Sequence, residues 1–164
     1  MKTLVIVRHA KSSWNNPGLS DHDRPLSKRG LKDAPIMGAR LAEWGPPVDR
    51  VISSSAMRAL TTAEMITHEM GLPWDEIVID EALYHASEED MLEIIWQQED
   101  YLDGLMLFGH NPGMTYLVNN LSDLDLDNLP TCGVVTLQFN VEDWTEVGEE
   151  PAELAEIYTP KNHR

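Results

Sequence analysis

The strongest constraint on the fold is an apolar run near the start of the chain that ends abruptly in two basic side chains. The segment 4–7 reads Leu-Val-Ile-Val, and Arg8 and His9 follow it directly. A short, mostly β-branched apolar run predicts a strand buried on both faces, as in the parallel sheets of α/β proteins. Such a strand delivers the residues after it to the carboxyl edge of the sheet, where ligands bind. The alternative is a strand that simply ends on two solvated polar residues.

Apolar runs and helical patterns alternate along the rest of the chain. We expect further strands over residues 48–52, 77–79, 105–108, 133–139 and 156–158, the last two as an antiparallel edge. We expect helices over about 28–44, from the serines at 53–55 to about 70, 88–98 and 113–121. The alternation predicts an α/β fold: a three-layer sandwich in which a mostly parallel sheet lies between helices on both faces. We expect residues 1–164 to form one domain.

Small polar residues mark the expected helix starts. Ser27 is predicted to cap the first helix, and one of the serines at 53–55 the second. Asn111 is predicted at the N-cap of the last helix, with Pro112 as its first residue.

Three of the expected strand ends carry groups that suit an oxyanion. Arg8 and His9 follow the first strand, Arg58 stands in the first turn of the helix after the second, and His110 follows the strand at 105–108. By chain polarity all of them reach the same edge of the sheet. An arginine in the first turn of a helix opposes the helix dipole, and a bound anion would explain its presence. Two guanidiniums and two imidazoles therefore predict a site for a tetrahedral anion.

Phosphoryl transfer is the chemistry that this set of groups suits best. It needs positive donors directed at the equatorial oxygens and a nucleophile in line with the leaving group. Nearby arginine charges favour the neutral, nucleophilic form of His9. We expect His9 to attack phosphorus and form a phosphohistidine intermediate that water then hydrolyses. Arg8 and Arg58 hold the phosphoryl oxygens in this scheme, and His110 donates to them.

The distribution of charge restricts the partners. The formal net charge is −16, and ten of the twelve Lys and Arg residues lie at or before Arg58. Any anion pocket must draw its cations from the first third of the chain, and the acidic remainder is expected to repel nucleic acid and anionic membranes. No apolar stretch approaches the roughly 20 residues of a membrane span. Since Cys132 is a single cysteine without a zinc-like spacing, we expect a cytoplasmic protein with no metal and no cofactor.

Four blocks, in order, resemble the histidine phosphatase superfamily. The segment 7–10, Val-Arg-His-Ala, is similar to the family's Arg-His-Gly signature, with Ala10 in place of the usual glycine. The segments 24–30, 53–63 and 109–113 resemble its later blocks. The small size of the chain and its first and last blocks make it most similar to the SixA-like phosphohistidine phosphatases.

The resemblance implies roles for individual residues. It implies that Arg8, Arg58 and His110 bind the phosphoryl group and that His9 is the nucleophile. Arg24 is a further candidate for the rim of the substrate pocket, the alternative being a solvated arginine at a helix start.

Two positions depart from the patterns of related branches. Relatives with broad phosphomonoesterase activity carry His-Asp at the second histidine, whereas Asn111 follows His110 here. The mutase-like branch carries a glutamate two residues after a leucine in the middle of the chain, and after Leu83 that place is His85. A strong general acid for an alkoxide leaving group is therefore not evident. A phosphohistidine substrate leaves as imidazole, whose pKa near 6.5 requires far less help, so N–P cleavage is favoured.

Other functions remain open from the sequence. The chain can be a small-molecule phosphomonoesterase, a phosphoglycerate-mutase-like enzyme, or a phosphohistidine-binding regulator without turnover. The corresponding partners are a phosphorylated protein such as a phosphotransfer domain, or a small phosphorylated substrate.

One tryptophan and four further histidines can be site residues or ordinary buried or surface residues. Trp14 is expected to be buried, although it can also wall the pocket. His85 is a candidate for the general acid, the alternative being a surface residue. His22, His68 and His163 have no partner at metal-ligand spacing and are expected on the surface.

Overall fold

The strands form one six-stranded sheet in the computed structural model, which describes residues 1–163. Their order across the sheet is β3-β2-β4-β1-β5-β6. β1 is parallel to β4, and β2 is parallel to both β3 and β4, whereas β5 is antiparallel to β1 and to β6. The predicted mostly parallel sheet with a late antiparallel edge is confirmed. The strands are β1 (Lys2–Arg8), β2 (Arg50–Ser53), β3 (Val78–Ile79), β4 (Gly104–Gly109), β5 (Val134–Phe139) and β6 (Leu154–Tyr158).

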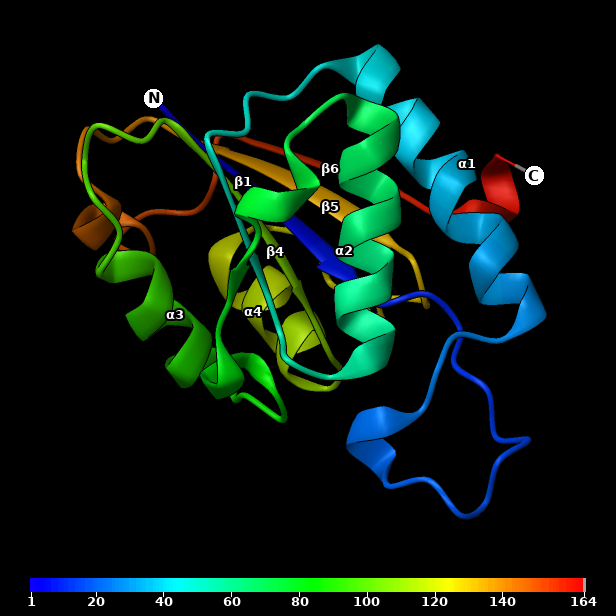
Figure 1. Cartoon of the computed structure of the whole chain (residues 1–164). Helices are drawn as coiled ribbons and strands as arrows, with labels where there is room; N and C mark the ends of the chain where they lie inside the picture. The colour runs from blue at the N-terminus through cyan, green and yellow to red at the C-terminus, as the bar shows by residue number, and fades with distance from the viewer. Residues whose placement is uncertain (164) are drawn as a thin grey trace.

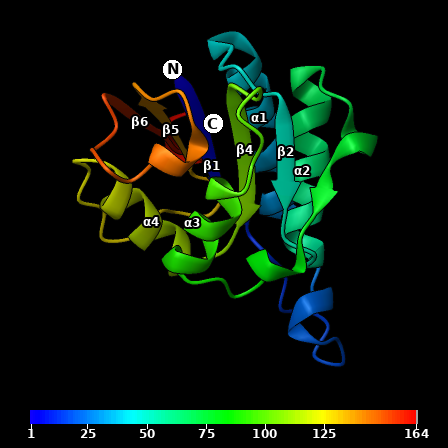
Figure 2. The same cartoon turned by 90° about the vertical axis from the view of Figure 1, so that its left-hand side faces the viewer.

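Two pairs of helices cover the two faces of the sheet (Figures 1 and 2). Side chains of β1 alternate between them, since Leu4 and Ile6 pack in the cluster with α3 and α4, and Val5 and Val7 in the cluster with α1 and α2. All four side chains are fully buried, and each such burial contributes roughly 1.5–3 kcal/mol. The α/β prediction is therefore confirmed. The helices are α1 (Lys28–Trp44), α2 (Met57–Met70), α3 (Glu88–Trp96) and α4 (Gly113–Leu121).

The first helix cap is as predicted and the second is not. The Ser27 hydroxyl accepts the Gly30 N–H, which satisfies a free donor at the start of α1. The N-cap position of α2 is Ala56, without a side-chain cap, so the serine prediction is wrong. Ser54 lies two residues earlier and accepts the Ala56 N–H, but its hydroxyl also contacts His110. Ser54, which the sequence pattern assigns to a helix start, thus contacts His110 at the carboxyl edge of the sheet.

The helix α4 spans the predicted residues 113–121, but its N-cap lies one residue later than predicted. Pro112 occupies the N-cap position, so the assignment of Asn111 to that position is wrong. The Asn111 side chain still accepts the backbone N–H of Thr115 at 3.2 Å, and its amide donates to the Leu129 carbonyl at 2.9 Å. Asn111 therefore ties the first turn of α4 to the loop before β5.

The helices that the structure describes are all too short or too polar to cross a membrane.

Candidate active site

The register of β1 and β4 places the two predicted histidines side by side. Arg8 pairs with Gly109 across these parallel strands, so His9 and His110 are the next residues on neighbouring strands. The His9 N–H donates to the Gly109 carbonyl at 3.1 Å, which fixes the first residue after β1. The two imidazole centroids lie 5.2 Å apart, and both side chains are buried.

The two predicted arginines join the histidines in one cavity. Arg58 stands in the first turn of α2, directly after β2, and is buried. Arg8 donates from Nη1 to the Leu129 carbonyl at 2.9 Å. We call Arg8, His9, Arg58 and His110 the floor residues. The cavity has a volume of about 280 Å³, and its lining comprises the floor residues with Lys11, Ser12, Trp14, Arg24, His85, Asn111 and Thr131.

Backbone contacts decide which nitrogen of His9 is free. Nδ1 lies 2.7 Å from the Ala10 carbonyl oxygen, which can only accept, so Nδ1 carries the proton and Nε2 keeps its lone pair. Burial lowers the pKa of His9 to about 4, and the charges of Arg58 and Arg8 act in the same direction against the opposing Ala10 hydrogen bond. His9 is therefore neutral at neutral pH, as a nitrogen nucleophile must be.

His110 has the same tautomer as His9, but its Nε2 is occupied by a hydrogen bond. Its Nε2 lies 2.8 Å from the Ser54 hydroxyl, which already accepts the Ala56 N–H. We assign the tautomer in which Ser54 donates to Nε2, so the proton lies on Nδ1. Burial, followed by the charge of His9, lowers the pKa of His110 to about 3. His110 therefore offers a neutral N–H donor.

Unpartnered donors concentrate at the floor. Within residues 1–163, the buried side-chain nitrogen or oxygen atoms without a hydrogen-bond partner are Arg8 Nε, Arg58 Nε and His110 Nδ1. Leaving such a group unsatisfied costs about 1–3 kcal/mol. Because all three carry a hydrogen and belong to one cavity, an oxyanion is the ligand that would satisfy them together.

Asp21 is the functional residue that the sequence analysis missed. Its Oδ2 accepts from Arg58 Nη2 at 3.1 Å and from the Tyr84 hydroxyl at 2.5 Å. Its Oδ1 accepts from Arg24 Nε at 3.2 Å, and its carbonyl oxygen from Arg58 Nη1 at 2.7 Å. The Tyr84 hydrogen bond, followed by the charge of Arg58, lowers the pKa of Asp21 to about 2. Its position three residues before Arg24 was the only signal in the sequence, since nothing there brings Tyr84 or Arg58 near it.

Arg24 lies in the cavity, as the rim prediction requires. It is buried, and its guanidinium carbon lies 3.5 Å from the centroid of the Trp14 ring. The expected burial of Trp14 is wrong, because the side chain is 76 % exposed and uses one ring face to cover Arg24. Stacking an arginine on an exposed indole is a favourable cation–π contact. The two residues therefore form a wall at the mouth of the site.

His85 stands at the same mouth. Its Nε2 lies 3.7 Å from Asp21 Oδ2, its ring lies 4.0 Å from that of Tyr84, and the residue is exposed. Its φ of 58° is unusual for a residue with a side chain, and such conformations occur often at functional sites. We call Trp14, Asp21, Arg24, Tyr84 and His85 the rim residues.

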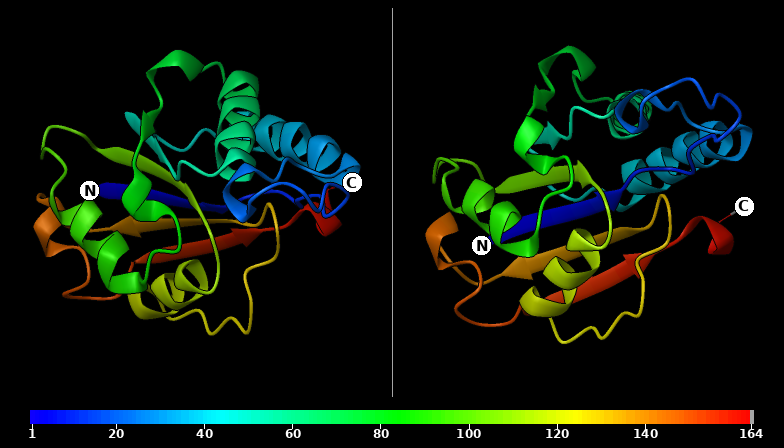
Figure 3. Two further views of the ribbon diagram at one scale, coloured as in Figure 1. Left: turned by 60° about the horizontal axis from the view of Figure 1, so that its bottom comes forward. Right: turned by 90° about the horizontal axis from the view of Figure 1, so that it is seen from below.

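The loop after β1 carries most of the rim and is anchored to α2. His22 Nε2 lies 2.9 Å from the Ser55 hydroxyl, and Figure 3 shows this loop passing beside the start of α2 before the chain enters α1. His22 is therefore half-buried rather than a free surface residue, and so is His163 against Trp44, whereas His68 is exposed as predicted. Among residues 1–163, no group of three His, Cys, Asp or Glu side chains is arranged to hold a metal ion.

Comparisons with known proteins agree with this geometry. Residues 4–86 match the model of the histidine phosphatase superfamily, branch 1. The structure is similar to the putative phosphohistidine phosphatase SixA of Agrobacterium tumefaciens, with a TM-score of 0.77 and 30% identity over 84% of this chain and 92% of that one. An uncharacterised protein of Mycobacterium tuberculosis is 29% identical over 94% of this chain and its own full length. A 2,3-bisphosphoglycerate-dependent phosphoglycerate mutase of Rhizobium etli is 35% identical over 54% of this chain and 43% of the mutase.

Proposed function

The chain belongs to the histidine phosphatase superfamily, and from this premise we propose that it hydrolyses phosphohistidine in proteins. The observation that carries the proposal is the state of the floor. His9 presents an unprotonated Nε2 beside three unpartnered N–H groups, on Arg8, Arg58 and His110. A nucleophile surrounded by donors for oxygen is the arrangement that phosphoryl transfer requires. We further propose that the enzyme acts in the cytoplasm on a phosphotransfer domain.

The reaction proceeds in two displacements. His9 Nε2 attacks phosphorus, a new N–P bond forms, and the N–P bond of the substrate breaks with its electron pair passing to the departing imidazole nitrogen, which takes up a proton. Arg8 Nε, Arg58 Nε and His110 Nδ1 donate to the phosphoryl oxygens during this transfer. Water then attacks the phosphoryl group on His9, releasing inorganic phosphate and restoring the free imidazole.

The protonation state of Asp21 favours an imidazole leaving group. An alkoxide has a high pKa and departs only when an acid protonates it. Asp21 is the carboxyl held against the arginines of the cavity, and its pKa of about 2 keeps it ionised at neutral pH. It therefore cannot supply that proton, whereas imidazole, with a pKa near 6.5, needs less help. His85, in the cavity lining, remains a candidate donor.

A second candidate is a phosphomonoesterase or mutase-like activity on small phosphate esters. It is favoured by the similarity to phosphoglycerate mutase over about half of this chain. The third alternative, a regulator that binds phosphohistidine without turnover, retains the floor but does not need the free Nε2 of His9.

Trapping the intermediate tests the proposal. A histidine peptide phosphorylated with phosphoramidate is mixed with enzyme and quenched in alkali, in which phosphohistidine is stable. We expect phosphate on His9, and we expect His9→Gln to lose turnover by roughly 10⁴-fold while still binding inorganic phosphate. Turnover that survives in His9→Gln would disprove the mechanism. Equally rapid hydrolysis of an alkyl phosphate ester such as phosphoserine, whose alkoxide leaving group needs an acid, would disprove the preference for N–P bonds and support the second candidate.

A further inference from the structure

The exposed positive charges of this acidic protein lie together on one helix and its neighbours. Five Lys and Arg side chains are exposed within residues 1–163, and none of them forms an ion pair within 4.0 Å. The other described cations are buried or half-buried. We call the exposed set the α1 basic surface; it comprises Lys11, Lys28, Arg29, Lys32 and Lys161.

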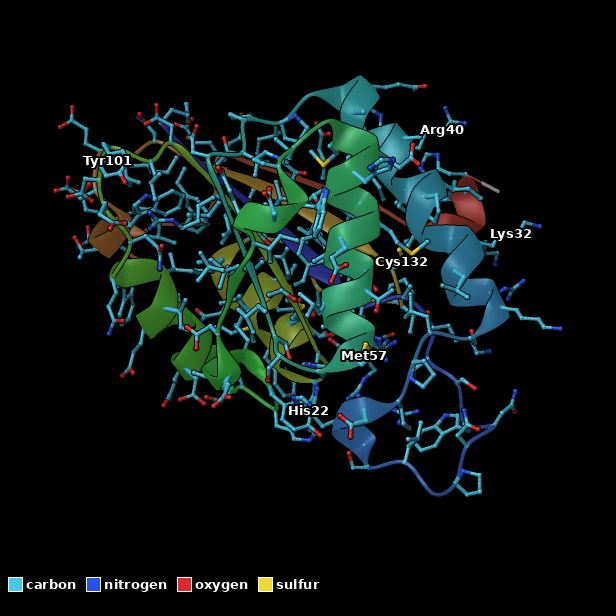
Figure 4. All side chains as sticks on the ribbon, viewed as in Figure 1. His22, Lys32, Arg40, Met57, Tyr101 and Cys132 are labelled. Carbon is cyan, nitrogen blue, oxygen red and sulfur yellow. The ribbon has the colours of Figure 1, made fainter. Side chains whose placement is uncertain are left out.

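Helix geometry arranges three of these cations in one patch. Lys28, Arg29 and Lys32 occupy the first two turns of α1, and residues four apart lie on the same face. Lys32 projects outward from α1 in Figure 4. Lys161 stands in the short C-terminal turn that packs against the same helix, beside it in Figure 1. Lysines in the first turn oppose the helix dipole, so helix stability does not explain them.

The α1 basic surface is continuous with the active-site cavity. Lys11 lines the cavity, and its carbonyl oxygen accepts both the N–H of Ser27 at 2.8 Å and the Ser27 hydroxyl at 3.0 Å. Ser27 is the residue directly before Lys28, the first residue of α1. Gly30 lies against the same Lys11 carbonyl, leaving no room for a Cβ between them. A molecule whose phosphoryl group is in the cavity therefore lies next to Lys11 and the start of α1, which carries Lys28, Arg29 and Lys32.

The same face carries exposed apolar side chains. Leu31 lies between Arg29 and Lys32 and is 48% exposed, and Trp14 stands at the cavity mouth. Aromatic residues and arginine are enriched at protein interfaces. Charged side chains around them fix the orientation in which a partner binds.

We propose that the α1 basic surface docks the acidic face of a protein that presents phosphohistidine to the cavity. This inference rests on the proposed function and names the partner's chemistry. The formal net charge of −16 repels acidic molecules overall, whereas this patch presents exposed cations beside the cavity, so an acidic partner is guided to approach through it. A membrane or a nucleic acid presents an extended anionic surface and would also meet the carboxylates, whereas a compact acidic protein face need not.

Two phosphohistidine peptides of equal length test the inference, one with glutamates and one with lysines flanking the phosphohistidine. We expect the wild-type enzyme to have a kcat/KM at least about tenfold higher for the acidic peptide at low salt, and the preference to shrink as salt screens the charges. Lys28→Glu with Lys32→Glu should remove or invert the preference while hydrolysis of free phosphohistidine stays unchanged. Glutamates near the helix N-terminus suit the dipole, so this variant is expected to fold.

A matched control separates local from overall charge. We compare two double variants, each of which makes the net charge more negative by two. The first is Lys28→Gln with Lys32→Gln, and the second is Gln97→Glu with Tyr101→Glu. Gln97 and Tyr101 follow α3 and lie away from the α1 basic surface. Only the first pair should lower kcat/KM for the acidic peptide. Equal effects of the two pairs, no preference between the peptides, or binding of phosphatidylserine vesicles through Lys28 and Lys32 would overturn the docking inference. Failure to hydrolyse either peptide and free phosphohistidine would instead overturn the proposed function.

Discussion

The floor and the rim of the cavity are built in different ways. The floor residues end β1, directly follow β1 or β4, or stand in the first turn of α2. Backbone hydrogen bonds of the sheet hold the strand ends, such as that from His9 to Gly109. The rim residues lie in irregular segments and are held by one another's side chains, with the exposed carboxylate of Asp21 at the centre. A sheet edge gives rigid positions for the reacting groups, whereas loops offer positions that substitution can change without cost to the core. Under the proposed function, the floor would therefore supply the chemistry and the rim would select the substrate.

The two regions meet at Arg58. Its Nη atoms both bond to Asp21, while its buried Nε has no hydrogen-bond partner. The rim thereby orients a floor residue without reaching the reacting atoms itself. Variants on either side of this contact should therefore differ in size and in kind of effect.

Replacing Arg58 tests the floor and is expected to give the largest effect. Arg58→Ala removes a donor to the phosphoryl group, and losing one such preorganised donor costs roughly 10²–10³-fold in rate. We expect kcat/KM for a phosphohistidine peptide to fall by this factor, measured by phosphate release.

Arg40→Ala is the matched control, because Arg40 lies outside the cavity and pairs with Glu43. It should leave kcat/KM unchanged. A loss below tenfold in Arg58→Ala would show that the floor is not the site of charge stabilisation.

The same contrast explains what the sequence could predict. The floor depends on strand ends, and apolar runs reveal strands, so the amino-acid pattern alone was enough to place Arg8, His9 and His110 on one edge of the sheet. The rim depends on where a long loop folds back, and no periodic pattern encodes that path. Asp21 meets Tyr84 across 63 positions of the chain, a contact that only the tertiary fold creates. The serine cap failed for a similar reason, since Ser54 is engaged by His110.

Stability against pH offers a second way to separate the two regions. The pKa of His9 is about 4 in the folded protein and 6.5 when exposed, so the unfolded state binds a proton that the folded state does not between these values. The contribution of His9 to the free energy of unfolding is therefore fully present above about pH 6.5 and is lost as the pH falls to about 4. For this difference in pKa the loss is about 3 kcal/mol. The coupled His110, with a pKa of about 3, acts in the same direction.

Urea denaturation between about pH 7 and pH 4.5 measures this loss. His9→Gln should make the dependence shallower, by about half, because the variant removes one of the two buried histidines that take up a proton on unfolding, and His110 remains. Asp21→Asn should not alter it in this range, because the Asp21 contribution is lost only as the pH falls from 3.8 towards about 2. An unchanged slope in His9→Gln would contradict the buried, neutral histidine.

Asp21→Asn tests whether the rim acts through the floor. Asparagine keeps the shape but loses the charge that holds Arg58 and Arg24, so we expect kcat to fall by about tenfold. The substitution also removes a negative charge from beside the cavity, so inhibition by inorganic phosphate should not weaken. This split between kcat and phosphate binding distinguishes a positioning residue from a general loss of structure.

Asp23→Asn is the control, because Asp23 lies in the same short turn and its carboxylate contacts His22 at 3.4 Å rather than an arginine. It should leave both kcat and phosphate inhibition unchanged. If Asp21→Asn behaves like Asp23→Asn, the rim does not position Arg58.

Trp14→Ala is expected to give the smallest effect and concerns selection alone. An exposed cation–π contact contributes about 0.5–1 kcal/mol, so removing the ring from Arg24 should raise KM for a phosphohistidine peptide by roughly two- to fivefold with little change in kcat. Trp74→Ala, at an exposed tryptophan outside the cavity, should change neither constant. We expect hydrolysis of free phosphohistidine to be unaffected by Trp14→Ala, because the ring contacts Arg24 rather than a floor residue. A fall in kcat with free phosphohistidine would instead show that Trp14 acts on the chemical step. It would contradict the proposal that the floor supplies the chemistry and the rim selects the substrate.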